Sequence, residues 1–394
     1  MLSMPAISTL SAPPDFDAVR ADFPRAATAA YLDNASCHPL SVDVAAALHR
    51  YIDWATCEVG DPWWPAWAPT RDESKRLFAQ LINAGPQEIA FARSAVEAES
   101  NLLNGLAEHL AGGHVVTHDL HYNAALYNYR MRQRDGLEVR IVKNRDWQID
   151  IDDVARVVDG NTRLIATTLV SNVNGYLSDI AALSDLAHAH GAYIYVDIIQ
   201  GAGAVPIDVR AMGIDFAACS TFKWLMGVKG FGFLYVREDL QGSVAKPTQH
   251  CGGVSFEYPP WRAPPYSAAG IAFAPVSGPG MYEVSYPSYE GAVSAQVSLR
   301  YIIDLGIDHI RAHARELTDR LQREMPALGY PSITPEDNES PIVSFVAADP
   351  EATMARLKQA GVHVALRFGD KIRISPSVYN NHQDLDRLLA ALPQ

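Results

Sequence analysis

Residues 193–236 read YIYVDIIQGAGAVPIDVRAMGIDFAACSTFKWLMGVKGFGFLYV, and this stretch decides the fold. Its first apolar run ends in Asp197, and Gln200 follows three residues later. Lys223 comes after a second short apolar run, between two aromatic residues, and a glycine-rich turn then leads into a third run. An acid at the end of a buried strand and a lysine in apolar surroundings are unusual enough to indicate a functional site.

Short apolar runs alternate with amphipathic segments upstream of this stretch as well. Such alternation predicts an α/β fold with a mostly parallel, seven-stranded sheet. The expected strands are 89–92, 114–117, 139–142, 164–169, 192–196, 216–219 and 232–236. We expect a large domain over 31–288 and a smaller α/β domain built from 1–30 and 289–394. Ligands of such sheets bind at the carboxyl ends of the strands, where Asp197 falls.

The pair of Asp197 and Lys223 matches what pyridoxal phosphate (PLP) needs from a protein. This cofactor takes a lysine amine for its Schiff base and a carboxylate facing its pyridine nitrogen. Burial lowers the pKa of a lysine, so that more of it is the neutral nucleophile. The carboxylate keeps the ring nitrogen protonated, which makes the ring an electron sink. We therefore predict PLP as cofactor, with Lys223 and Asp197 as catalytic residues.

The order of these residues resembles the class V, fold-type I PLP enzymes, such as cysteine desulfurases, isopenicillin N epimerase, kynureninase and the ergothioneine-pathway C–S lyases. Their pattern is roughly VDxxQ followed by DFxxxSxHKxLxGPxGxGFLYV, and the chain offers VDIIQ from Val196 and DFAACSTFKWLMG from Asp215. The resemblance covers most of the chain. It implies the fold-type I architecture, an active site at the domain and subunit boundary, and a homodimer.

The resemblance also implies how the phosphate is held. The turn after the first strand reads RSAVE, and Ala95 and Val96 stand where relatives carry two threonines. Only backbone contacts are then left there, at the start of a helix whose dipole favours an anion, with Ser94 as a further donor. Ser220 matches the phosphate-binding serine, whereas Phe222 replaces a histidine of many relatives. We expect cofactor affinity to depend on the helix start, Ser220 and the Schiff base.

Other cofactor contacts follow from the same resemblance. His121 matches the histidine that stacks over the pyridine ring and can act on the substrate, with Tyr122 as the alternative if the register shifts by one. Asn172 would lie near the ring oxygen and the substrate carboxylate, and Gln200 would hydrogen-bond the ring oxygen. Tyr286 stands where relatives reach the phosphate of the partner subunit.

Two further positions concern the substrate. Residues 371–376 read KIRISP and match a stretch of relatives, so Arg373 is the candidate clamp for the α-carboxylate of an amino acid. Arg367, nearby in sequence, is the alternative. The turn YLDNAS from Tyr31 matches a segment that lies beside the active site, which makes Asn34 a candidate substrate contact.

One departure from the family pattern reduces the number of expected activities. Cysteine desulfurases carry a nucleophilic cysteine just before the KIRISP stretch, where this chain reads ALRFGD, and no cysteine follows Cys251. A persulfide-forming enzyme needs that thiolate, so we predict neither a desulfurase nor a selenocysteine lyase. The preferred prediction is β-elimination from an S-conjugated cysteine, because the aromatic loops at 61–67 and 244–280 could shape a large pocket. Relatives in antibiotic pathways suggest secondary metabolism.

Alternatives within the family remain: an epimerase, an aminotransferase or a decarboxylating oxidative deaminase. Outside it, a catalytically dead scaffold would keep the fold as a binding protein, but the chain retains the lysine, the acid and the arginine. A nicotinamide-binding protein is disfavoured because no GxGxxG follows the first strand.

Composition restricts partners and location. The 394-residue chain has a formal net charge of −13 and no basic run, which argues against nucleic acid or an anionic membrane as partner. The four cysteines show no metal-ligand or CxxC spacing, which is typical of a reducing cytoplasm. No apolar run is long enough to span a bilayer, and the N-terminus does not read as a signal peptide. We expect a cytoplasmic enzyme that binds a small amino acid.

Overall fold

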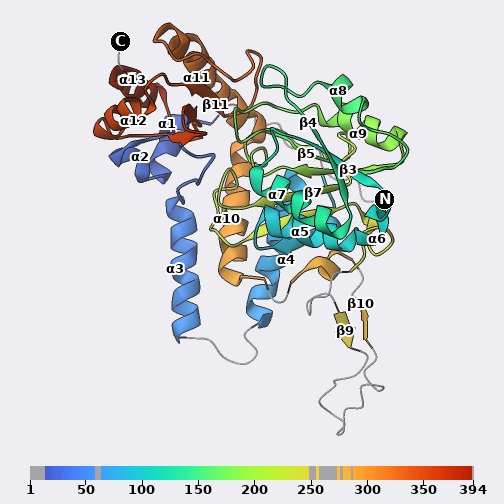
Figure 1. The fold of residues 1–394 in the computed structure, drawn as a ribbon. Coiled ribbons are helices and arrows are strands. Elements are labelled where there is room, and N and C mark those ends of the chain that lie inside the picture. Colours follow the sequence, from blue (N-terminus) through green and yellow to red (C-terminus); the bar gives the residue numbers. More distant parts are fainter. Residues whose placement is uncertain are drawn as a thin grey trace.

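The computed structural model describes residues 14–57, 64–247, 254–256, 273–275, 278–284 and 287–392. Its centre is a seven-stranded sheet (Figure 1). Across the sheet the strands are β2 (Ile89–Ala92), β8 (Gly232–Val236), β7 (Phe216–Ser220), β6 (Tyr193–Asp197), β5 (Thr162–Thr168), β3 (His114–His118) and β4 (Glu138–Val142). β8 runs antiparallel to both its neighbours, and the other pairings are parallel.

The sheet confirms the predicted fold class. Each expected apolar run is a strand, with ends that differ from the prediction by no more than two residues. The central strands β6, β7 and β8 are apolar and buried almost throughout, because helices cover both faces of a parallel sheet and leave no solvent side. This is why continuous apolar runs, rather than alternating ones, marked these strands in the sequence.

Helices connect and cover the strands. Those of the sheet region are α3 (Val42–Cys57), α4 (Trp64–Leu81), α5 (Ala95–Gly105), α6 (Ala107–Leu110), α7 (Asn123–Arg132), α8 (Ile151–Ala155), α9 (Ile180–Ala189) and α10 (Tyr289–Leu305). α5 packs on β7 and β8, and α9 packs on β5 and β6. α10 packs along α3 and α4 and contributes Ala292, Leu299 and Ile302 to the larger of two hydrophobic clusters.

A second, smaller sheet follows α10. It consists of β11 (Val343–Val346), β14 (Lys371–Ile374) and β13 (Ala365–Arg367), all antiparallel. Helices α11 (Ile307–Ala327), α12 (Pro350–Gln359) and α13 (His382–Ala391) complete this part. Its smaller hydrophobic cluster includes Leu321, Phe345, Ile372 and Leu385. The smaller C-terminal α/β unit is thus present, while the domain boundaries at 31 and 288 stay a prediction.

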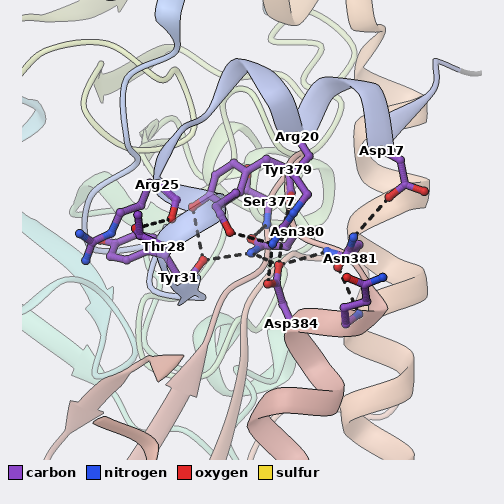
Figure 2. Close-up of polar contacts among 12 residues, drawn as sticks. Asp17, Arg20, Arg25, Thr28, Tyr31, Ser377, Tyr379, Asn380, Asn381 and Asp384 are labelled. Carbon is purple, nitrogen blue, oxygen red and sulfur yellow. Dashed lines mark hydrogen bonds and ion pairs between the residues drawn. The ribbon is translucent and has the colours of Figure 1, made fainter. Parts of the chain in front are cut away.

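The N-terminal segment packs against the C-terminal one. α1 (Phe16–Val19) and α2 (Arg25–Thr28) lie beside α12 and α13 (Figure 1), and β1 (Ala30–Tyr31) pairs with β12 (Val362–His363). Arg20 donates to the Tyr379 carbonyl at 2.7 Å and pairs with Asp384 at 2.8 Å (Figure 2). Asn380 joins the network by donating to Asp384 and to the Tyr31 carbonyl. These contacts bring the two ends of the chain together.

Two more strands, β9 (Val254–Phe256) and β10 (Phe273–Pro275), form an antiparallel ribbon away from the sheets. Short 3₁₀ turns lie at Arg20–Asp22, Pro86–Glu88, Gln133–Asp135, Glu238–Leu240 and Pro279–Tyr282. Among the described helices, none is both long and apolar enough to cross a lipid bilayer.

Candidate active site

A cavity of about 640 Å³ opens at the carboxyl ends of the central strands. Its walls come from the large sheet, from the start of α5 and from the β13–β14 hairpin of the small sheet. Nine of the eleven predicted site residues line it: Ala95, Val96, His121, Asn172, Asp197, Gln200, Ser220, Lys223 and Arg373. Residues up to 278 positions apart in the chain therefore line one cavity, which includes the strand end where the sequence pattern places Asp197.

Lys223 and Asp197 are both buried in this cavity. Asp197 is the last residue of β6, and Lys223 follows β7, the next strand of the sheet. Burial lowers the pKa of Lys223 to about 8, although the nearby Asp197 opposes the shift. Burial raises the pKa of Asp197 to about 6. The Ile199 amide, which donates to its Oδ1 at 2.9 Å, opposes this rise. At neutral pH the acid is mostly ionised, and a fraction of the lysine is neutral.

The start of α5 forms a cradle at the cavity wall. Ser94 caps the helix by accepting the Glu97 amide at 3.1 Å, and the Ser220 hydroxyl accepts the Ala95 amide at 2.8 Å. The Val96 amide lies between these two and has no acceptor among the described hydrogen bonds, and the Ser220 hydroxyl keeps its own proton to donate. This donor set, at the positive end of an 11-residue helix, fits a phosphate.

His121 lies on the cavity wall after β3. It is buried, and burial lowers its pKa to about 3, so its ring is neutral at physiological pH. Tyr122, the alternative predicted for this position, also lines the cavity, and its ring centroid lies 5.8 Å from the Lys223 Nζ. Both aromatic candidates thus line the cavity that contains the lysine, and either ring could stack on a flat ligand.

Gln200 and Asn172 are held by neighbouring groups. Gln200 accepts the Trp224 indole N–H at 2.8 Å and donates one amide hydrogen to the Ala35 carbonyl at 3.0 Å, which leaves its second hydrogen for a ligand. The backbone carbonyl of Asn172 accepts a hydrogen bond from Arg373 Nη1 at 2.9 Å, and Asn172 also lines the cavity.

Two arginines meet at one hydroxyl beside the lysine. Arg373 is 1% exposed and donates to Asp33 at 3.1 Å and to the Ser36 hydroxyl at 2.7 Å. Arg367 donates to the same Ser36 hydroxyl at 2.7 Å. The Nε atoms of both arginines are buried without a partner among the described residues, and burial lowers the pKa of Arg373 to about 10. Both candidates for the carboxylate clamp therefore stand at the cavity, and they form its positive end.

Of the two remaining predicted contacts, one lies away from the described cavity and the other is outside the described residues. Asn34 is buried, but its amide donates to the Ser375 carbonyl and its oxygen accepts the Tyr379 hydroxyl at 2.6 Å, so it does not line the cavity. Its role toward substrate stays a prediction. Tyr286 lies outside the described residues, as do 58–63, the side chains of 64–67 and most of 248–277.

Sequence reasoning missed Ser36 and the hairpin tip. Ser36 carries no motif of its own, and only the turn in which it stands was noticed. Leu366 and Phe368 border the cavity from the hairpin, where the sequence pattern points only to Arg367 and to the absence of a cysteine. No cysteine is found among the residues that line the described cavity.

The side chains of the cavity fit PLP. They provide a buried lysine, an acid at the end of the neighbouring strand, a cradle for the phosphate and an aromatic ring that can stack on the cofactor. The fold and site thus define a PLP-dependent enzyme of the fold-type I architecture. Residues 30–388 match the family model described as Aminotransferase class-V, and the chain belongs to this family.

Similar proteins agree with this assignment. A probable cysteine desulfurase of Methanothermobacter thermautotrophicus is 28% identical, over 94% of this chain and 95% of its own. A cysteine desulfurase of Escherichia coli O7:K1 is also 28% identical, over 95% and 97%. Among solved structures, apo cysteine desulfurase from Thermococcus onnurineus NA1 has a TM-score of 0.85 at 22% identity, covering 97% of this chain and 98% of that one. The cystine C–S lyase C-DES, in complex with its product cysteine persulfide, has a TM-score of 0.82 at 19% identity, covering 94% and 98%.

Proposed function

We propose that the protein cleaves the C–S bond of an S-substituted cysteine by β-elimination. With one water, the reaction breaks the bond between Cβ and sulfur and yields a thiol, pyruvate and ammonium. One observation carries the proposal: the described cavity combines a buried lysine, an acid and two arginines but is lined by no thiol that could accept sulfur. Relatives named cysteine desulfurases and a cystine C–S lyase support C–S chemistry in this fold.

Each residue then has a defined task. Bound PLP supplies the electron sink that makes a proton on Cα acidic. Lys223, whose pKa is lowered to about 8, removes that proton because a usable fraction of its amine is neutral at physiological pH. Asp197 stays ionised toward the ring nitrogen.

Arg373 and Arg367 hold the substrate. Both arginines line the cavity, and their guanidiniums supply the positive charge that attracts the α-carboxylate, which fixes Cα relative to the Lys223 amine. The same residues would serve an epimerase or an aminotransferase, so the products must decide between these reactions.

The test combines the site of attachment with the products. Borohydride reduction and mass spectrometry should find the phosphopyridoxyl group on Lys223. Separate incubation of the unreduced enzyme with S-alkyl cysteines in D₂O should release equal amounts of thiol and pyruvate, and the Lys223→Ala protein should release neither.

Other outcomes contradict the proposal. Deuterium at Cα in otherwise intact substrate would mean an epimerase, and a keto acid that retains its thioether would mean an aminotransferase. An adduct on another residue would remove the basis of the site itself.

A further inference from the structure

The tip of the β13–β14 hairpin is short and tightly turned. Arg367 pairs with Lys371, so only residues 368–370 connect the two strands. Phe368 has a φ of 50° and Gly369 a φ of 86°, so both residues lie in the left-handed region. Glycine adopts this conformation freely, but for an aromatic residue it is unfavourable.

Phe368 is also exposed at the cavity. It is 65% exposed, and Leu366 is 37% exposed, and both side chains line the cavity. Among the described residues, the other exposed large apolar side chains are Val42, Ile52, Tyr127 and Ile151, and only Tyr127 is as exposed as Phe368. Single exposed apolar residues are common, but two that border one ligand cavity are typical of a binding surface.

The unfavourable backbone of Phe368 strengthens this interpretation. Asparagine or glycine would close such a turn at lower cost. Residues held in sparsely populated conformations cluster at functional sites, where the surrounding structure retains them for their side chain. The stability of the hairpin therefore does not explain the phenylalanine, whereas a contact between its ring and a ligand does.

The tip also has a defined place relative to the substrate's polar end. Arg367 lies between Leu366 and Phe368 in the chain and turns its guanidinium to Ser36, beside Arg373. A substrate whose carboxylate is held by the arginines would have its amine at the cofactor that Lys223 binds, so only its side chain is left to meet the apolar tip. The cavity volume of about 640 Å³ is in the usual range for sites that hold larger ligands.

We propose that Leu366 and Phe368 form a binding subsite for the substituent on the substrate sulfur, and that this substituent is apolar and preferably aromatic. This inference rests on the proposed C–S cleavage. Where cysteine desulfurases carry a thiol in this stretch, this chain presents an apolar wall. The enzyme therefore recognises a cysteine conjugate rather than cysteine itself.

The test measures binding rather than turnover. Holoenzyme is titrated with norvaline and with 2-amino-5-phenylpentanoic acid, in which carbon replaces the sulfur of S-methyl- and S-benzylcysteine. The change in visible absorbance of the bound cofactor reports each Kd. We expect the phenyl compound to bind at least about tenfold more tightly, since burial of an aromatic ring on an apolar wall is strongly favourable.

The variants separate the contribution of the Phe368 ring to binding from the effect of its backbone conformation on stability. Phe368→Gly should reduce the preference to about threefold or less, while its Tm stays unchanged or rises because glycine tolerates the positive φ. Phe368→Tyr should keep the preference, and Leu366→Ala should reduce it in part. Tyr127→Ala removes an equally exposed aromatic residue that does not line the cavity, and it should change nothing.

One result would overturn the subsite, namely a preference that Phe368→Gly leaves intact. If the same Phe368→Gly protein also dissociates in sedimentation at a concentration where Tyr127→Ala stays associated, the tip is a contact between two copies. If Phe368→Gly abolishes the preference but the wild-type enzyme cleaves no C–S bond, only the proposed reaction is contradicted, because binding needs no turnover.

Discussion

Asp197 illustrates at the scale of one residue how function and stability conflict. Its carboxylate is buried, and burial raises its pKa from the ordinary value of 3.8 to about 6. The stability contributed by this group is therefore fully present below pH 3.8 and is lost as the pH rises to about 6. At neutral pH the ionised group costs the cofactor-free protein on the order of 3 kcal/mol, at about 1.4 kcal/mol per pKa unit.

We therefore expect Asp197→Asn to raise the free energy of unfolding of the cofactor-free protein by about 1–3 kcal/mol at pH 8, and to abolish activity. The asparagine can still accept the Ile199 amide, so the turn is preserved. Urea unfolding at pH 5 and pH 8 measures the difference, which should shrink toward pH 5. A wild-type protein that is the more stable one at pH 8 contradicts this account.

Lys223 gives a second pH dependence. Because its pKa is lowered to about 8, the fraction of neutral amine rises steeply up to that pH and then levels off. The rate at which cofactor-free protein takes up PLP should therefore rise about tenfold from pH 7 to pH 9 and then reach a plateau. Stopped-flow absorbance measures this rate. A rate that keeps climbing to pH 10 would mean that the lysine is not desolvated.

The start of α5 matters at the scale of an element, because helix stability and phosphate binding use the same residues. Ser94→Ala removes the cap on the Glu97 amide and should cost about 1 kcal/mol of stability, with weaker PLP binding. Ser94→Asp keeps a cap, so stability should be retained, but its charge repels the phosphate and PLP affinity should fall at least as far. Thermal unfolding and PLP titration separate the two effects. Equal PLP affinity in Ser94→Asp and wild type would place the phosphate elsewhere.

The strands were readily predicted at this scale. β6, β7 and β8 are local apolar runs, and their burial on both faces marks them as strands without knowledge of their neighbours. The β13–β14 hairpin differs, because the sequence identifies its arginines and its lack of a cysteine but not the role of Leu366 and Phe368. The left-handed backbone of Phe368 depends on the pairing of two strands and has no signature in the sequence.

The whole molecule depends on contacts between the chain ends. Arg20 and Asp384 join the first helices to the last one and thereby hold the segment that continues into Asp33 and Ser36, the partners of Arg373. Arg20→Ala should lower the free energy of unfolding by about 1–3 kcal/mol, because it leaves the buried Asp384 without its cation.

The same variant should also expose the N-terminal segment to limited proteolysis. Exposed Arg50→Ala on α3 is the matched control, and it should resemble the wild type in both urea unfolding and proteolysis. If the two variants behave alike, the pairing of the chain ends contributes nothing to stability.

The amino-acid sequence by itself determined the fold class, the cofactor and the pairing of Asp197 with Lys223, because apolar runs and their terminal residues are local features. The tertiary structure alone decided which polar groups meet. Arg373 finds Asp33 and Ser36 more than 330 residues away, and Arg367 reaches the same hydroxyl. Asn34, in the same turn as Ser36, is turned away from the cavity by hydrogen bonds to the C-terminal segment. Side-chain direction depends on such long-range partners, which no local pattern encodes.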